Sequence, residues 1–136
     1  MMRVTLYLSD RLYGFCEPVE GEGQVFFHAS VFHRLQDQEP PPILGELVEV
    51  VVGDFVSPGA PRALSVTRLA APTYNEGKVL SFDVQQGWGF VRDDSGKEFF
   101  LHRSDILNGR IPIRGQRVRF INGNKNARPR ACYIEV

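Results

Sequence analysis

Two short segments, Gly87-Trp88-Gly89-Phe90-Val91 and Phe99-Phe100-Leu101-His102, decide the fold of this chain. In a β-strand every second side chain points to the same face, so each segment places two rings on one face. The intervening Asp93-Asp94-Ser95-Gly96 is typical of a turn, which predicts that the two strands pair antiparallel. The paired strands then share one patch of rings, which consists of Trp88, Phe90, Phe100 and His102.

The same pattern occurs earlier in the chain, in the same order. The matching segments are Tyr13-Gly14-Phe15 with Trp88-Gly89-Phe90, Phe26-Phe27-His28 with Phe100-Leu101-His102, Pro42-Ile43-Leu44-Gly45 with Pro112-Ile113-Arg114-Gly115, and Pro61-Arg62-Ala63 with Pro129-Arg130-Ala131. Ordered matches of this kind indicate the duplication of a module of roughly 65 residues. We therefore expect two small domains, 1–70 and 71–136.

Both modules have the apolar pattern of β-structure. Each contains five short runs rich in Val, Leu, Phe and Tyr, and neither leaves room for crossover helices. The expected strands are Arg3–Leu8, Gly14–Cys16, Gln24–His28, Leu47–Val52, Ala63–Leu69, Lys78–Phe82, Gly87–Arg92, Glu98–His102, Arg117–Ile121 and Ala131–Val136. This predicts an all-β protein of two tandem five-stranded antiparallel barrels. After each third strand we expect one helical turn with a serine as its N-cap, at Ser30–Leu35 and Ser104–Leu107.

The net charge of zero conceals a difference between the halves. Residues 1–70 hold five Lys/Arg and nine Asp/Glu, a balance of −4, whereas residues 71–136 hold 11 and seven, a balance of +4. Such asymmetry suggests that only the second half faces a polyanion. Drift in surface charge without a function is the alternative.

Several classes of protein are not indicated by the sequence. We find no nucleophile–base pair, no paired carboxylates and no phosphate-binding loop, so we expect neither enzymatic activity nor a cofactor. Cys16 and Cys132 fall at positions that are apolar in the other copy, which suggests small core residues. No histidine has a second ligand at metal-binding spacing. No apolar run could span a bilayer and no secretory signal is visible, so we expect a cytoplasmic protein without membrane contact.

Aromatic rings on the outside of a small barrel are typical of surfaces that bind a flat ligand. Because Val91, Phe99 and Leu101 already supply the inner face, we assign the rings to the outer face. A role in the core is the alternative. Single-stranded bases stack on exposed rings with about 1–3 kcal/mol each, and cations hold the phosphates. We expect Gly87 and Gly89 to leave open space for a base beside Trp88. The nearby cations are Lys78, Arg92, Lys97, Arg103, Lys125, Arg128 and Arg130.

The second module resembles the bacterial cold-shock domain. The resemblance is carried by Gly77-Lys78-Val79-Leu80-Ser81-Phe82, Gly87-Trp88-Gly89-Phe90-Val91, Phe99-Phe100-Leu101-His102-Arg103-Ser104 and Gly115-Gln116-Arg117-Val118-Arg119-Phe120, and it covers 77–136. It implies an oligonucleotide-binding barrel (OB-fold) that binds single-stranded RNA or DNA with little sequence preference. The stacking residues that it implies are Phe82, Trp88, Phe90, Phe100 and His102. Together with two of the nearby cations, Lys78 and Arg103, they make up the nucleic-acid site that we expect.

Three positions differ from the pattern of that family. Ser81 stands where a tryptophan is usual, Gln86 where a lysine is usual, and Arg103 where an aromatic residue usually follows the histidine. A guanidinium can still stack or pair with phosphate. We therefore expect weaker binding than that of a typical member.

The first module is a more divergent, acidic version of the second. It keeps rings at the matching positions, which are Tyr7, Tyr13, Phe15, Phe26 and His28. Its loop Glu17–Glu22 contains three glutamates, which repel phosphates within the Debye length of about 8 Å at physiological salt. Two interpretations remain: a second base-stacking surface, or a surface for packing or a protein partner, which we favour slightly. The rival function for the chain is accordingly a protein-interaction module of the transcription or translation machinery, in which the acidic domain docks on a partner.

Overall fold

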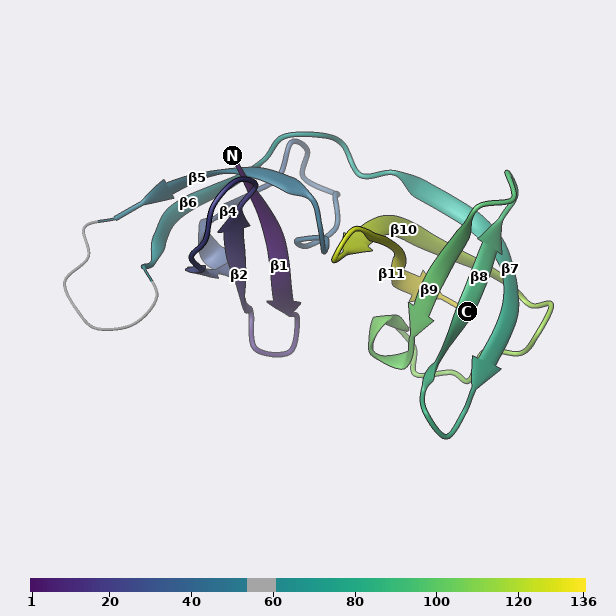
Figure 1. The fold of residues 1–136 in the computed structure, drawn as a ribbon. Coiled ribbons are helices and arrows are strands. Elements are labelled where there is room, and N and C mark those ends of the chain that lie inside the picture. Colours follow the sequence, from purple (N-terminus) through teal and green to yellow (C-terminus); the bar gives the residue numbers. More distant parts are fainter. Residues whose placement is uncertain (54–60) are drawn as a thin grey trace. The chain divides into compact units, whose positions relative to one another are not determined.

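The computed structural model describes residues 1–53 and 61–136, and the chain divides into two compact units, Met1–Ala71 and Pro72–Val136. Both units are built from short strands with one 3₁₀ turn each (Figure 1). Within the described residues, no helix has the length and apolar character needed to cross a membrane. The all-β class predicted from the sequence is confirmed.

The second unit is a closed barrel of five strands. They are β7 (Tyr74–Asp83), β8 (Trp88–Asp93), β9 (Glu98–His102), β10 (Arg117–Lys125) and β11 (Arg128–Glu135). Their order is β10-β11-β9-β8-β7, and β7 pairs with β10 to complete the barrel. This is a five-stranded barrel of the OB-fold type.

One strand pair of this barrel departs from the expected antiparallel arrangement. β11 forms a hairpin with β10 and consequently runs in the same direction as β9, so these two strands pair in parallel, through Arg130 and Phe100. The other pairs are antiparallel. Turn signals in a sequence predict pairing between consecutive strands. β9 and β11 are separated by β10, so their pairing could not be predicted in this way.

The inner face of the barrel is filled by apolar side chains from every strand. The core consists of Val79, Val91, Phe99, Leu101, Ile106, Val118, Phe120, Ala131 and Ile134. On β8 and β9 the buried side chains alternate with outward ones, as the period of a half-buried strand requires. The predicted inner positions of these two strands are therefore confirmed.

The first unit has the same order of elements and one additional short strand. Its elements are β1 (Met2–Leu8), β2 (Tyr13–Pro18), β3 (Val25–His28), the 3₁₀ turn η1 (Ala29–Val31), β4 (Phe32–His33), β5 (Leu47–Val52) and β6 (Ala63–Arg68). They form a six-stranded sheet in the order β3-β2-β1-β5-β6-β4. An isolated parallel bridge joins Phe26 to Arg62, at the repeat positions of the Phe100–Arg130 pair that closes the second barrel.

The 3₁₀ turns are shorter than expected and are capped by histidines. η1 follows His28, and the second turn, η2 (Arg103–Asp105), follows His102. In each case the histidine Nδ1 accepts the backbone N–H of the serine two residues later, at 3.0 Å from Ser30 and 3.1 Å from Ser104. The prediction that the serines are the N-caps was therefore wrong: each turn begins one residue before its serine, and the histidine that precedes the turn caps it.

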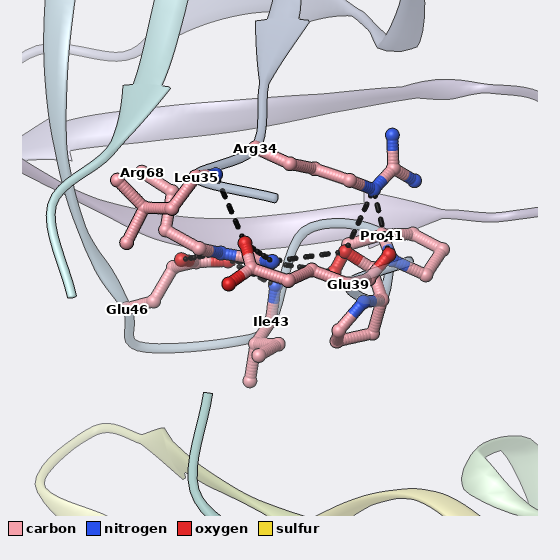
Figure 2. A network of polar contacts seen from close by, with 8 residues as sticks. Arg34, Leu35, Glu39, Pro41, Ile43, Glu46 and Arg68 are labelled. Carbon is pink, nitrogen blue, oxygen red and sulfur yellow. Dashed lines mark hydrogen bonds and ion pairs between the residues drawn. The ribbon is translucent and has the colours of Figure 1, made fainter. Parts of the chain in front are cut away.

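A buried arginine distinguishes the first unit from the second. The Arg68 side chain is fully buried, and its Nε and Nη2 donate to the two carboxylate oxygens of Glu46 at 2.7 and 2.9 Å (Figure 2). Its terminal nitrogens also donate to the carbonyl oxygens of Pro40 and Pro41, at 3.0 and 2.9 Å. The proline-rich loop is thus tied to the end of β6. The corresponding residue of the second unit is Val136, which cannot form this network.

Candidate nucleic-acid interface

The side chains of Trp88, Phe90, Phe100 and His102 form a continuous ring platform on β8 and β9. Strand pairing places Trp88 opposite His102 and Phe90 opposite Phe100. The Phe100 ring centroid lies 6.1 Å from that of Trp88, 5.9 Å from that of Phe90 and 6.3 Å from that of His102. Directly opposite residues in an antiparallel pair share a face, so the four rings form one surface.

The ring platform faces solvent. Trp88 is 39% exposed and Phe90 38% exposed, while the side chains of Val91 and Phe99 on the opposite face are buried. The alternative that these rings belong to the core therefore does not hold for Trp88 and Phe90. Exposed rings that contact one another over a filled core offer an apolar surface for stacking.

Gln86 holds the indole of Trp88 in place. Its side-chain oxygen accepts a hydrogen bond from Trp88 Nε1 at 2.8 Å. The Gly87 carbonyl between them accepts the backbone N–H of Arg103 at 2.9 Å, which joins the turn before β8 to η2. In the sequence, Gln86 stood out only because the cold-shock family usually has a lysine at this position. Its role in orienting Trp88 was not predicted.

The two glycines beside Trp88 do not leave open space, contrary to expectation. A Cβ atom on Gly89 would collide with the carbonyl oxygen of Ser81 on β7. Gly87 has a φ of +78°, and its Cα faces the Arg103 side chain. Close approach of backbone and side chain explains both glycines. The surface available to a base is therefore the rings themselves.

His102 is held as a neutral imidazole with a fixed orientation. Its Nδ1 accepts the Ser104 backbone N–H and also lies 2.7 Å from the Ser104 hydroxyl oxygen. Burial, followed by the positive charge of Arg130, lowers the pKa of His102 below its ordinary value. Because Nδ1 accepts, the proton of the neutral ring is on Nε2, which can donate to a base edge.

The predicted cations differ in how strongly they are already paired. Lys78 is exposed on β7 and lies between Arg92 and Arg117 in the strand register. Arg92 is 3.9 Å from Glu98 at its nearest approach, and Arg117 donates to both carboxylate oxygens of Asp94 at 3.1 and 3.0 Å. Both pairs are exposed to solvent and contribute little to stability, so phosphate can compete for these arginines.

An ion pair at the edge of the ring platform was not predicted. The Arg130 guanidinium carbon lies 5.6 Å from the Phe100 ring centroid, and Arg130 Nε donates to Asp105 at 2.8 Å. The sequence marked Arg130 only as one of several phosphate-binding cations. The contact of Asp105 could not be predicted, because no local sequence pattern indicates that η2 brings this residue close to β11.

Phe82 lies apart from the ring platform. A register shift between Val79 and Ser81 places Ser81 opposite Phe90 and Phe82 opposite Gly89. The half-buried Phe82 side chain consequently packs against the core. We leave Phe82 out of the candidate site, since the bulge turns Ser81 toward the platform face in its place.

The first unit repeats the ring arrangement closely. Tyr13 and Phe15 are 6.3 Å apart at an interplanar angle of 90°, compared with 6.0 Å and 89° for Trp88 and Phe90. Phe26 contacts both rings, and His28 lies opposite Tyr13 in the register. We call Tyr13, Phe15, Phe26 and His28 the first-unit rings. Tyr7 is not among them: like Phe82 it lies on the core side, where it stacks on Phe27 at 6.1 Å.

The structure offers no candidate for a metal centre in the part of the chain that it describes. No three His, Cys, Asp or Glu side chains among residues 1–53 and 61–136 come together in a way that could hold an ion. Both cysteines are buried, Cys16 in the core of the first unit and Cys132 on β11.

The second unit is similar to a known domain family. No curated protein matches the chain. A solved structure described as Drosophila Unr CSD456 aligns with 98% of this chain and 60% of its own length, at 20% identity and a TM-score of 0.39. The chain thus spans about 60% of that structure. Residues 75–136 match the family model of the 'Cold-shock' DNA-binding domain, so the second unit is similar over nearly its whole length to a nucleic-acid-binding domain.

Proposed function

We propose that this chain binds single-stranded RNA or DNA, mainly through a basic domain of residues 71–136. In this proposal bases stack on the ring platform, and Lys78 and Arg103 contact the phosphates. The observation that supports it best is the ring platform itself, because its rings Trp88 and Phe90 are exposed beside a core that is already complete. Every base has a π-face, so such a surface accepts many sequences.

The proposal is tested by titrating the full chain with short single strands of DNA and RNA. Trp88 is the only tryptophan, so its fluorescence reports directly on the ring platform. We expect quenching that saturates, and an affinity that falls steeply as salt is raised, because phosphate contacts release counterions. Unchanged emission at saturating oligonucleotide would contradict base stacking on Trp88.

A second candidate function concerns the acidic domain of residues 1–70. Its rings are arranged as in the second unit, but the end of β2 contributes Glu17, and the loop after it contributes Glu20 and Glu22. An aromatic surface beside negative charge suits a basic protein partner, for example one of the transcription or translation machinery. This candidate predicts partner binding that is lost on Phe15→Ala/Phe26→Ala while oligonucleotide affinity is retained. Loss of oligonucleotide affinity with no loss of partner binding would exclude it.

A further inference from the structure

Resting on the proposed binding of single strands, we infer that Arg130 is a specificity-determining residue that contacts the edge of a guanine stacked beside Phe100. Asp105 is its positioning residue. The inference goes beyond stacking, because stacking alone accepts every base and gives little sequence preference.

The Arg130 guanidinium is fixed over the ring of Phe100, on the β11 side of the ring platform. Its carbon lies 5.6 Å from the Phe100 ring centroid, and its Nε is bound to Asp105 at 2.8 Å. The Arg130 side chain is 11% exposed and that of Asp105 15%, so the pair is more shielded than the other ion pairs of the second unit. A guanidinium that is already ordered loses less conformational entropy on binding.

The remaining donors of Arg130 are available to a ligand. No described residue forms a hydrogen bond with its Nη1 or Nη2. No side-chain nitrogen or oxygen within residues 1–53 and 61–136 is buried without a partner, so these two nitrogens reach the surface. Arg130 therefore presents free N–H groups in the fixed plane of its guanidinium, next to the ring on which a base would stack.

Guanine is the base whose edge fits these donors best. Its O6 and N7 are adjacent acceptors, which arginine contacts through two N–H groups in the most common specific contact of this kind. Adenine places an amino donor beside N7, and a pyrimidine covers less of the ring platform. A phosphate could also occupy the donors, but Lys78 and Arg103 are more exposed and suit a mobile backbone better.

The first unit has an arginine at the corresponding position but lacks a carboxylate that would position it. Arg62 lies 5.5 Å from the Phe26 ring centroid, much as Arg130 lies beside Phe100. At the repeat position of Asp105, however, the first unit has Val31, and Arg62 is exposed. Arg130 and Arg62 thus lie beside equivalent rings, but only Arg130 is held by the carboxylate of Asp105.

The test uses the full chain and measures the quenching of Trp88 by short thymidine oligonucleotides. A series in which one guanine replaces each thymine in turn should contain a position where affinity rises about fivefold or more. Inosine, which keeps O6 and N7, should preserve the gain at that position. Replacement by 7-deazaguanine, which lacks N7, should lose most of it.

Two matched variants test the residue. Arg130→Lys keeps the charge and a partner for Asp105 but loses the planar pair of donors, so it should abolish the guanine preference while affinity for plain oligothymidine changes little. Arg128→Lys changes an exposed arginine of the same strand and should keep the preference.

The inference is overturned if wild-type protein binds the whole series equally, if 7-deazaguanine is bound like guanine, or if Arg130→Lys keeps the preference. The experiments with modified bases use the wild-type protein only. They therefore test the guanine contact even if Arg130→Lys fails to fold. Failure of the wild-type protein to bind any single strand would instead refute the proposed function, and the inference with it.

Discussion

Phe90 and Phe100 stand opposite each other on β8 and β9 and form the centre of the ring platform. We expect Phe90→Ala and Phe100→Ala each to weaken oligonucleotide binding by about 1–3 kcal/mol, because each removes one stacking surface. The fold should survive, since neither side chain belongs to the core. Binding isotherms followed by Trp88 quenching, with circular dichroism of each variant, measure both effects. Leu64→Ala, at an exposed position of the first unit, serves as the control and should leave affinity unchanged.

The capping histidine gives a second expectation at this scale, which concerns pH. Burial and then the charge of Arg130 lower the pKa of His102 in the folded chain, so the unfolded chain takes up a proton first as pH falls. The stability that His102 contributes is therefore complete above its ordinary pKa of about 6.5 and is lost as pH falls toward the lowered value. Urea unfolding at pH 7 and at pH 5 measures this loss.

His102→Asn is the matched variant for that measurement. An asparagine side-chain oxygen can accept the Ser104 N–H as the imidazole does, but it does not titrate in this range. We expect a smaller drop in the free energy of unfolding between pH 7 and pH 5 in this variant than in the wild type. An equal drop in both proteins would show that other groups cause the pH dependence.

At the scale of elements, the ten predicted strands and the outward face of β8 and β9 could be derived from the sequence because their evidence is local. Alternation of apolar residues identifies a strand and its buried side without any knowledge of its neighbours. The position of Phe82 could not be derived in this way. Its side is set by the register shift between Val79 and Ser81, and a single extra residue in a strand reverses the faces after it.

The closing pair and the Arg130–Asp105 contact escaped prediction for a related reason. β11 meets β9 only after the chain has passed through η2 and β10, so the residues that meet are distant in sequence and share no periodic pattern. The repeat itself contained a usable signal. Arg62 and Arg130 occupy matching positions, and both lie beside the phenylalanine of the matching strand.

The Arg68 network leads to a prediction about the first unit. Arg68→Val should lower the free energy of unfolding by about 3–5 kcal/mol, because Glu46 and Glu39 would lose their buried partner. The double variant Arg68→Val/Glu46→Gln introduces the residues that the second unit has at these positions, Val136 and Gln116. It should be less destabilised than the single variant, since it leaves less uncompensated charge. Denaturant unfolding of the full chain compares the two, and equal losses would contradict a charge-based cause.

At the scale of the whole molecule, the two units share the arrangement of their rings but differ in their charge. The first-unit rings and the ring platform agree in ring spacing, in the histidine cap and in the arginine beside the central phenylalanine. The balance of charge, in contrast, is −4 over residues 1–70 and +4 over residues 71–136. The two halves therefore have similar ring geometry, and the property in which they differ is their charge.

This contrast predicts how affinity divides between the halves. A fragment of residues 71–136 should retain most of the oligonucleotide affinity of the full chain, and a fragment of residues 1–70 should bind poorly at the same salt, because phosphates meet repulsion there. The difference in affinity between the two fragments should become smaller as salt is raised, because salt screens the repulsion between phosphates and the glutamates of the first unit while base stacking persists. Fluorescence anisotropy of a labelled single strand measures all three proteins, once circular dichroism has shown that each fragment is folded. Equal affinity of two folded fragments at low salt would mean that the first-unit rings bind bases despite their acidic loop, and the proposed division between the domains would be wrong.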